Sequence, residues 1–236
     1  MLSPTYINGL DSILYGGLVR PSSMLVAGAT GSGRTILCLN SLFAAAKAGE
    51  KCFYITILSE THDKLLQIAS NYSFFDTELL KNDNFKLLEL DKEIITKGDY
   101  AILKYFHSLI QEKPDRVIID PVTLFQYISP SFEDDRELSP LEKRIFFTNL
   151  LRAFEASNIL LIMTADLAGD EIDTSIFSYL SDVVLELGYR DQKSDEANRY
   201  ISIIKSRGRN YVGGKHDLKL STCGLVVSYN LPAQKM

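Results

Sequence analysis

One glycine-rich turn constrains the fold of this chain more than any other segment. The apolar run Ser23-Met24-Leu25-Val26-Ala27 leads into Gly28-Ala29-Thr30-Gly31-Ser32-Gly33-Arg34-Thr35, and a second apolar run begins at Ile36. A strand, a glycine turn and a helix with this spacing are typical of a phosphate-binding loop. Glycines let backbone N–H groups close around a phosphate, and the unpaired N–H groups at a helix start attract the anion. Other turns rich in Gly and Ser look similar, but three glycines in register favour phosphate binding.

The loop departs from the usual G-x-x-x-x-G-K-[ST] pattern at one position, because Arg34 stands where lysine is expected. We expect Arg34 to supply positive charge to the outer phosphates, and Thr35 to place its hydroxyl on Mg²⁺. A guanidinium is planar and wider than an ammonium group, so it needs more room in a tight loop. We therefore expect nucleotide binding to tolerate the change better than hydrolysis.

Length and composition predict a single intracellular domain over residues 1–236. Hydrophobic residues make up 46% and charged residues 23% of the chain, and we find no internal repeat or linker. A net charge of −5 argues against a general electrostatic attraction to nucleic acid or to an anionic membrane. Residues 1–5 lack the basic start of a signal peptide, and no apolar stretch is long enough to span a bilayer. The three widely spaced cysteines are expected to be buried thiols of a reducing cytoplasm, where we place the protein.

Strand-like apolar runs alternate with helical patterns along most of the chain, and strands alone follow. We expect strands at 23–27, 51–58, 84–90, 116–120, 159–164, 182–188, 199–205, 216–221 and 225–229, with a hairpin tip at 191–196. We expect helices at 34–47, 61–72, 100–112 and 139–157, and a short one near the N-terminus that ends at Gly16 and Gly17. This order predicts an α/β fold whose central sheet is mostly parallel, flanked by helices and extended by C-terminal antiparallel strands.

Three further polar residues are candidates for chemistry at strand ends. Asp120 ends the apolar run Val117-Ile118-Ile119, where a phosphate-loop protein holds Mg²⁺ through water; the alternative is a carboxylate that caps a turn. Glu60 follows the next strand after the loop helix and could orient the attacking water, or it could simply favour a helix start. Thr164 could contact the terminal phosphate or the water, or be an ordinary turn hydroxyl.

Two cations near the C-terminus share one face of a predicted strand. Lys205 and Arg207 lie two residues apart, so strand periodicity directs both side chains the same way. Such a pair suits an anionic partner, including a nucleotide held by a neighbouring subunit, although a solvated strand end is the simpler interpretation. His62, His107 and His216 are scattered and have no metal-ligand spacing.

The order of these motifs resembles the KaiC-like branch of the RecA-type ATPases, over nearly the whole chain. The resemblance rests on Ile7-Asn8-Gly9-Leu10-Asp11, Gly16-Gly17-Leu18, the loop Gly28 to Thr35, Tyr54-Ile55-Thr56 followed by Glu60, Val117-Ile118-Ile119-Asp120 and Lys205-Ser206-Arg207-Gly208 before a terminal β-hairpin. It implies a RecA-like fold in a single KaiC domain, with ATP and Mg²⁺ as cofactors. It also implies assembly into homo-oligomers with nucleotide at the subunit interfaces, since the ring-forming relatives usually assemble as hexamers.

The resemblance also implies roles for individual residues. Nucleotide would bind the loop residues and two cations of a neighbouring subunit, namely Gly28, Ala29, Thr30, Gly31, Ser32, Gly33, Arg34, Thr35 and Ile36 with Lys205 and Arg207. Thr35 and Asp120 would serve Mg²⁺, with Asp120 as the Walker B acid. The pair of carboxylates typical of the family after the second strand is reduced here to Glu60, preceded by Leu58 and Ser59. This change, like Arg34, affects hydrolysis more than fold.

Three functions fit these observations. The first is an ATP-binding, slowly hydrolysing oligomeric switch in signalling or regulation, and the second is an assembly protein that has lost hydrolysis and uses ATP as structural glue. The third is a recombinase-like partner in DNA repair. Its DNA-binding loops would be residues 129–139 and 166–174, where acidic side chains predominate and would repel phosphates. We therefore expect nucleic acid not to be a partner.

Overall fold

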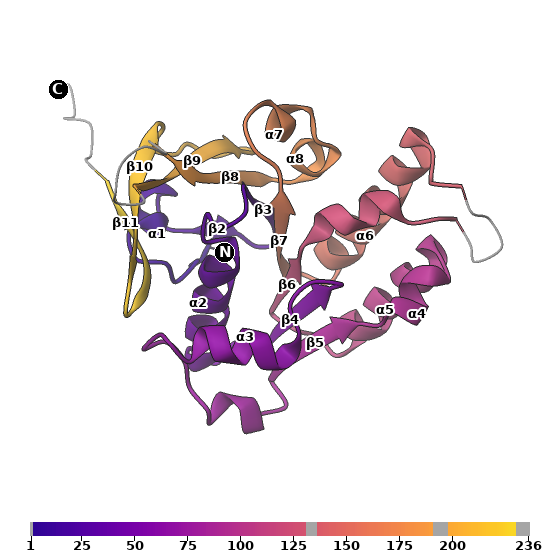
Figure 1. Cartoon of the computed structure of the whole chain (residues 1–236), viewed down its shortest axis with the longest axis horizontal. Helices are drawn as coiled ribbons and strands as arrows, with labels where there is room; N and C mark the ends of the chain where they lie inside the picture. Colours follow the sequence, from indigo (N-terminus) through magenta and orange to yellow (C-terminus); the bar gives the residue numbers. More distant parts are fainter. Residues whose placement is uncertain (1, 131–135, 191–197, 230–236) are drawn as a thin grey trace.

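The protein is built around a twisted β-sheet, seen in a computed structural model whose described residues are 2–130, 136–190 and 198–229. Within these residues the sheet has nine strands in the order β11-β10-β9-β8-β3-β7-β6-β4-β5 (Figure 1). Strands β8, β3, β7, β6, β4 and β5 run parallel, and β9, β10 and β11 extend the sheet antiparallel. The strands are β3 Ser22–Gly28, β4 Cys52–Ile57, β5 Phe85–Leu90, β6 Arg116–Asp120, β7 Leu160–Asp166, β8 Val183–Tyr189, β9 Arg199–Ser206, β10 Lys215–Ser221 and β11 Gly224–Ser228. This arrangement confirms the predicted fold class.

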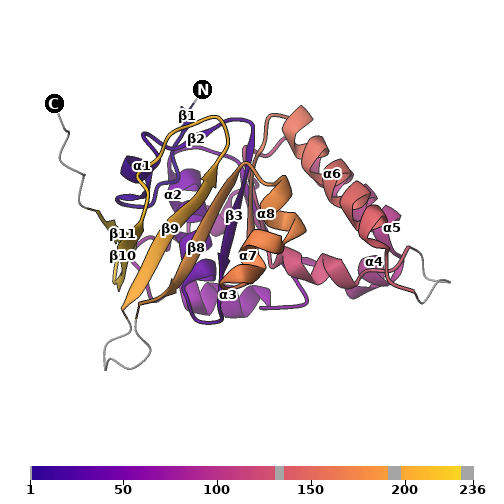
Figure 2. The ribbon, with the colours of Figure 1, turned by 90° about the horizontal axis from the view of Figure 1, so that it is seen from above.

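Helices cover both faces of the sheet and bury two apolar cores. Successive residues of β3 point to opposite faces, so Met24 and Val26 enter one core while Leu25 and Ala27 enter the other. The first core lies under α1, α2 and α3, and the second under α5, α6 and α8 (Figure 2). The helices are α1 Leu10–Ile13, α2 Arg34–Lys47, α3 His62–Ala69, α4 Lys92–Thr96, α5 Asp99–Gln111, α6 Pro140–Ala156, α7 Asp170–Thr174 and α8 Ile176–Leu180. None of the helices in the described residues is long and apolar enough to span a bilayer.

The long helices were predicted more accurately than the short ones. Helix α2 has the predicted bounds, and α6 begins at a capping box formed by Ser139 and Glu142. Helix α3 ends at Ala69, three residues before the predicted end, and the short helices α4, α7 and α8 were not predicted. The predicted hairpin tip at 191–196 lies outside the described residues.

Two predictions were wrong, namely the end of strand β7 and the burial of Cys223. Strand β7 extends to Asp166, two residues past the predicted end at Thr164, because it keeps pairing with β3 as far as Gly28. Cys38 and Cys52 are buried as predicted, but Cys223 is exposed, because it lies in the tight turn that joins β10 to β11. The predicted strands 216–221 and 225–229 place Cys223 in the turn between them, and this position is the signal that separates it from the other two cysteines.

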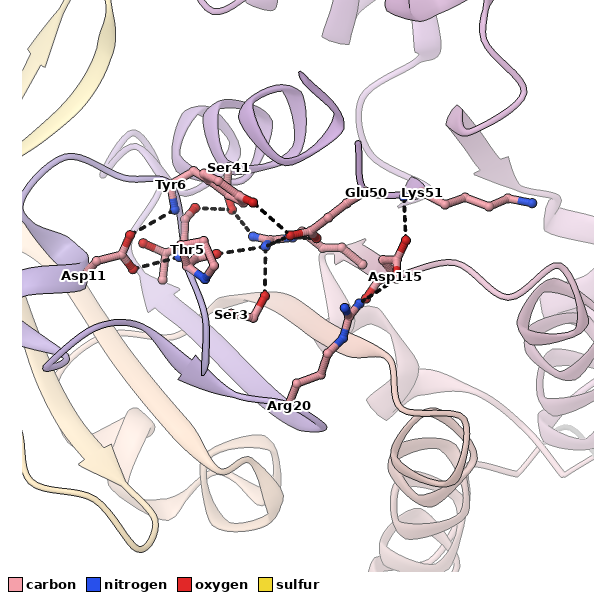
Figure 3. Close-up of polar contacts among 11 residues, drawn as sticks. Ser3, Thr5, Tyr6, Asp11, Arg20, Ser41, Glu50, Lys51 and Asp115 are labelled. Carbon is pink, nitrogen blue, oxygen red and sulfur yellow. Dashed lines mark hydrogen bonds and ion pairs between the residues drawn. The ribbon is translucent and has the colours of Figure 1, made fainter. Parts of the chain in front are cut away.

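The N-terminal segment is attached to the sheet through a buried arginine at the start of β6. Arg116 is fully buried, donates to both carboxylate oxygens of Glu50 and to the hydroxyl of Ser41, and also donates to the carbonyl of Pro4. Figure 3 shows Ser3, Thr5 and Tyr6 gathered beside Ser41 of α2 and Glu50. This network fixes the C-terminal end of α2 against the sheet, and α2 is the helix that follows the glycine loop.

Candidate functional site

The glycine loop lies at the carboxyl edge of the parallel strands, between β3 and α2. Gly31 and Gly33 have φ values of +79° and +109°, in the left-handed region that favours glycine. A Cβ on Gly28 would lie 2.4 Å from the carbonyl oxygen of Leu187, so this position has no room for a side chain. Gly33 is the N-cap residue of α2, and no side chain caps the helix. The first N–H groups of α2 are therefore available to an anion.

Two polar atoms of the loop are buried without a partner among the described residues. They are Oγ of Ser32 and Nη1 of Arg34. A buried polar atom without a hydrogen bond costs free energy, and a ligand oxygen in the loop is one way to satisfy it. The residues present therefore fit a bound phosphate chain.

Asp120 is the centre of a buried cluster of hydroxyl groups. Its side chain accepts from Thr35 Oγ1 at 3.1 Å and from the hydroxyls of Tyr54 and Thr164. The residue is 8% exposed. Burial raises the pKa of Tyr54 well above its ordinary value, with a further contribution from Asp120, so Tyr54 remains a donor. The cluster holds the carboxylate in one orientation beside the first turn of α2.

The structure brings together the two residues predicted to serve Mg²⁺. Thr35 and Asp120 are in direct hydrogen-bond contact, although 85 residues separate them in the sequence. Among the described residues, no group of three His, Cys, Asp or Glu side chains is placed to hold a metal by itself. A hydroxyl and one nearby carboxylate suit Mg²⁺, which takes its remaining ligands from phosphates and water.

Thr164 is not the turn hydroxyl that was one of its two predicted roles, whereas its contact with a terminal phosphate or a water stays a prediction. It lies inside β7, is completely buried, and donates to Asp120. It is therefore not a turn hydroxyl, because its strand continues to Asp166. Tyr54, in contrast, was not predicted as a site residue, since nothing in an apolar strand such as Cys52-Phe53-Tyr54-Ile55 indicates which side chain faces a distant carboxylate.

Arg34 contacts a carboxylate of its own chain. Its Nη2 atom pairs with Oδ1 of Asp166, the last residue of β7. The Arg34 side chain is 13% exposed and that of Asp166 is 50% exposed. Asp166 was considered in the sequence only as one acid of a loop, because its position at a strand end beside the glycine turn depends on the pairing of β3 with β7.

Two further side chains that the sequence analysis did not predict, Tyr189 and Arg199, contact the backbone of the loop. The carbonyl of Gly31 accepts from the hydroxyl of Tyr189 at 2.6 Å and from Nε and Nη2 of Arg199, both at 3.4 Å. The Arg199 guanidinium lies 5.4 Å from the ring centroid of Tyr189. These two side chains come from the facing ends of β8 and β9, so the antiparallel extension of the sheet supports the glycine loop.

Glu60 lies near Asp120 at the same edge of the sheet but does not join its cluster. The preceding residue, Ser59, donates to the carbonyl oxygen of Asp120 at 3.1 Å. Glu60 is exposed and lines a cavity of ≈ 370 Å³ together with Glu89 and Asp91. The chain turns sharply before it, since Leu58 has a φ of +46°. Glu60 is therefore open to solvent at the edge of the sheet that also carries the glycine loop.

Lys205 and Arg207 share a face, as their spacing indicates, but they lie far from the loop of their own chain. Both donate to the carbonyl of Tyr179, at 2.9 and 3.4 Å. Lys205 pairs with Val184 near the beginning of β8, whereas the glycine loop leaves β3 level with Leu187 near the other end. Burial lowers the pKa of Lys205, and the neighbouring charge of Arg207 lowers it further. Arg207 also forms an ion pair with Asp182 at 3.3 Å, so the contacts of both cations are with residues around β8 and not with the glycine loop.

Known proteins resemble this chain over almost its whole length. The family described as "ATPase: KaiC" matches residues 3–231. The circadian clock oscillator protein KaiC of Prochlorococcus marinus (strain MIT 9313) is 23% identical over 241 residues, which covers 95% of this chain and 45% of that protein. The circadian clock protein KaiC2 of Synechocystis sp. (strain ATCC 27184 / PCC 6803 / Kazusa) is 28% identical over 230 residues, covering 94% and 38%. The chain thus spans less than half the length of these relatives.

A solved structure shows the same fold. The KaiC-like protein of the hyperthermophilic archaeon Pyrococcus horikoshii OT3 superposes with a TM-score of 0.80 and 18% sequence identity, covering 97% of this chain and 99% of that one. This likeness confirms the RecA-like sheet and its C-terminal antiparallel strands. Because the family match extends over residues 3–231, the chain belongs to the KaiC family of ATP-binding P-loop NTPases.

Proposed function

We propose that this chain binds ATP with Mg²⁺ at the loop Gly28 to Ile36, hydrolyses it slowly, and uses the bound nucleotide to control assembly with further copies of itself. The observation that carries the proposal is the contact of Thr35 with Asp120 beside the uncapped start of α2. It joins an anion-binding helix terminus to a hydroxyl and a carboxylate suited to Mg²⁺. The protein would act as an oligomeric switch in signalling or regulation.

Each residue of the buried cluster has a defined task in this proposal. Backbone N–H groups of the loop bind the phosphates, and the Thr35 hydroxyl coordinates the metal. Asp120 holds the metal through water, while Tyr54 and Thr164 keep the Asp120 carboxylate oriented. Bound Mg²⁺ supplies charge neutralisation at the phosphate oxygens. The contact of Thr164 with Asp120 supports a positioning role for this residue, and its contact with the terminal phosphate or the water stays a prediction.

Glu60 is the proposed base that orients or deprotonates the attacking water. Its exposed side chain follows Ser59, whose hydroxyl donates to the backbone carbonyl of Asp120, and this neighbourhood supports the proposal. A water attacking the terminal phosphate needs a group of this kind within reach. A Glu60→Gln variant keeps the size of the side chain and removes its basicity, so it tests this role directly.

Lys205 and Arg207 are proposed to contact the nucleotide of a neighbouring copy. They lie at the opposite edge of the sheet from their own glycine loop, and both side chains face the same way. A head-to-tail arrangement that places this edge of one copy against the loop of the next uses both surfaces, and it closes into a ring when the rotation allows. ATP would then be shared between two subunits.

The test combines particle mass with phosphate release, each measured with and without Mg-ATP. The proposal predicts larger particles in Mg-ATP and a slow release of phosphate that disappears in Glu60→Gln. In Lys205→Ala, larger particles should no longer form, whereas Lys104→Ala, an exposed lysine of α5, should behave like the unchanged protein. Larger particles without any phosphate release would instead identify an assembly protein that has lost hydrolysis. Particles of one mass under all conditions would contradict the switch.

A further inference from the structure

The carboxylate of Asp166 lies beside the glycine loop and pairs with Arg34, the cationic side chain of that loop. Strands β3 and β7 pair Gly28 with Asp166, so the last residue of β7 stands beside the first glycine of the loop. Thr164 lies two residues earlier and therefore faces the same side of the strand. These two side chains contact Asp120 and Arg34 respectively, so β7 supplies both a hydroxyl and a carboxylate to the site.

The contact between Asp166 and Arg34 is unfavourable for the binding of a triphosphate, because it places a negative charge beside the phosphate-binding cation. Arg34 is the side chain of the loop that carries positive charge, and one of its two terminal nitrogens is engaged by Asp166. The other, Nη1, is buried without a partner among the described residues. Arg199 also reaches the loop, but through the carbonyl of Gly31 on the outside. An outer phosphate that approaches Arg34 therefore meets the negative charge of Asp166 on the same guanidinium.

We propose that Asp166 sets the affinity of the site: it holds Arg34 when no triphosphate is bound, and an outer phosphate has to take its place on the guanidinium. This inference rests on the proposed function and adds a residue to it. Asp166 and the outer phosphate compete because a guanidinium forms its strongest hydrogen bonds when both terminal nitrogens donate to one partner. In the structure only one nitrogen contacts Asp166, which leaves this pair open to exchange.

The pair also gives a reason for arginine at this position. A lysine ammonium is a single point charge, whereas the guanidinium reaches Asp166 with one nitrogen while the other, Nη1, is buried without a partner among the described residues. Replacing Asp166 by a neutral side chain should therefore free Arg34 for phosphate. We expect the gain to be larger for a triphosphate than for a diphosphate, because the triphosphate brings more negative charge to the same place.

The experiment measures the dissociation constants of Mg-ATP and Mg-ADP for Asp166→Asn by titration calorimetry on the full chain. The exchange keeps the shape of the side chain and removes its charge. Mg-ATP should bind about 10-fold more tightly and Mg-ADP about 3-fold, the size expected for one like charge partly screened by water. Asp170→Asn makes the same charge change at an exposed position of α7 and should alter binding by less than about 2-fold.

The same exchange made in an Arg34→Ala variant separates competition for Arg34 from simple repulsion between Asp166 and the phosphates. In Arg34→Ala, Asp166 has no guanidinium to hold, so adding Asp166→Asn should improve Mg-ATP binding by only about 2-fold. Asp166 is half exposed, so the variant should fold, and an unchanged melting temperature will verify this.

The possible results distinguish this inference from the proposed function. Tighter Mg-ATP binding by Asp166→Asn that shrinks to about 2-fold when Arg34 is alanine supports the inference. An equal gain with and without Arg34 would show simple repulsion and overturn it. Equal or weaker binding by Asp166→Asn overturns it and makes Asp166 a residue that positions Arg34 for phosphate. If no variant binds nucleotide, both the inference and the proposed function fail.

Discussion

Replacing Asp120 by asparagine should separate the function of the site from the stability of the fold. Three hydroxyls donate to this carboxylate: Thr35 and Tyr54 to Oδ2, and Thr164 to Oδ1. If the amide nitrogen takes the place of Oδ1, the remaining oxygen still accepts from Thr35 and Tyr54. Only the bond with Thr164 reverses, and a hydroxyl oxygen can accept as well as donate.

The expected cost in stability is therefore small. Exchanging a charged for a neutral hydrogen bond should lower the free energy of unfolding by about 1 kcal/mol without nucleotide. The cost in metal binding should be large, since groups around a metal site contribute about 10- to 100-fold to affinity. Stabilisation by the ligand reports the loss of metal binding. At a concentration of 100 times its dissociation constant, Mg-ATP raises the free energy of unfolding by about 2.7 kcal/mol. A 100-fold weaker site would gain only about 0.4 kcal/mol at the same concentration.

Urea unfolding measures both quantities in one series. The unchanged protein and Asp120→Asn are unfolded with Mg²⁺ alone, with Mg-ATP, and with ATP in excess EDTA. In the unchanged protein, we expect EDTA to remove most of the increase in unfolding free energy that Mg-ATP gives. In Asp120→Asn, we expect EDTA to change the unfolding free energy very little. The reasoning is refuted if Asp120→Asn retains the full gain from Mg-ATP, or if it loses more than about 4 kcal/mol without nucleotide, which would make Asp120 a structural residue.

Three further predictions follow from contacts outside the buried cluster. Arg116→Met leaves the carboxylate of Glu50 without its charged partner and should cost about 3–5 kcal/mol of unfolding free energy by urea titration, and a loss below about 1 kcal/mol would contradict this. Hydrogen bonds from Arg136 and Ser139 hold the pKa of Glu142 below its ordinary value of 4.5. Because the folded-state pKa is the lower one, this stabilisation is present above pH 4.5 and is lost as the pH falls below it. Melting temperatures measured from pH 6 downward should therefore fall less steeply for Glu142→Gln, and an unchanged slope would count against the contact. Tyr189→Phe removes a donor to Gly31 and should weaken Mg-ATP binding by about 2- to 5-fold with little change in melting temperature, whereas unchanged affinity would show that the loop does not need this support.

The parts of the fold with a strong local signal could be predicted from the sequence. The glycine spacing placed the loop, the helical period placed α2 and α6, and the apolar run before Asp120 placed an acid at a strand end. Parallel strands bring their carboxyl ends to one edge of the sheet, so Thr35 and Asp120 could be expected to meet. The structure confirms that contact.

The partners of the loop could not be predicted in the same way. Asp166 contacts Arg34 across 132 residues, and Tyr189 contacts Gly31 across 158. Such contacts depend on the strand order and on the register of each pair, and a single strand pattern carries neither. The short helices α7 and α8, of five residues each, are too brief to show a helical period. The omission of α7 and of the last residues of β7 made residues 166–174 look like a loop.

The most direct test of the account is a crystal structure of the protein with Mg²⁺ and a non-hydrolysable ATP analogue. We predict that the phosphates contact backbone N–H groups at the start of α2, that Thr35 coordinates the metal, and that Arg34 turns from Asp166 to the outer phosphate. A loop without nucleotide at saturating analogue, with Arg34 still paired to Asp166, would contradict the central claim that this turn captures a triphosphate.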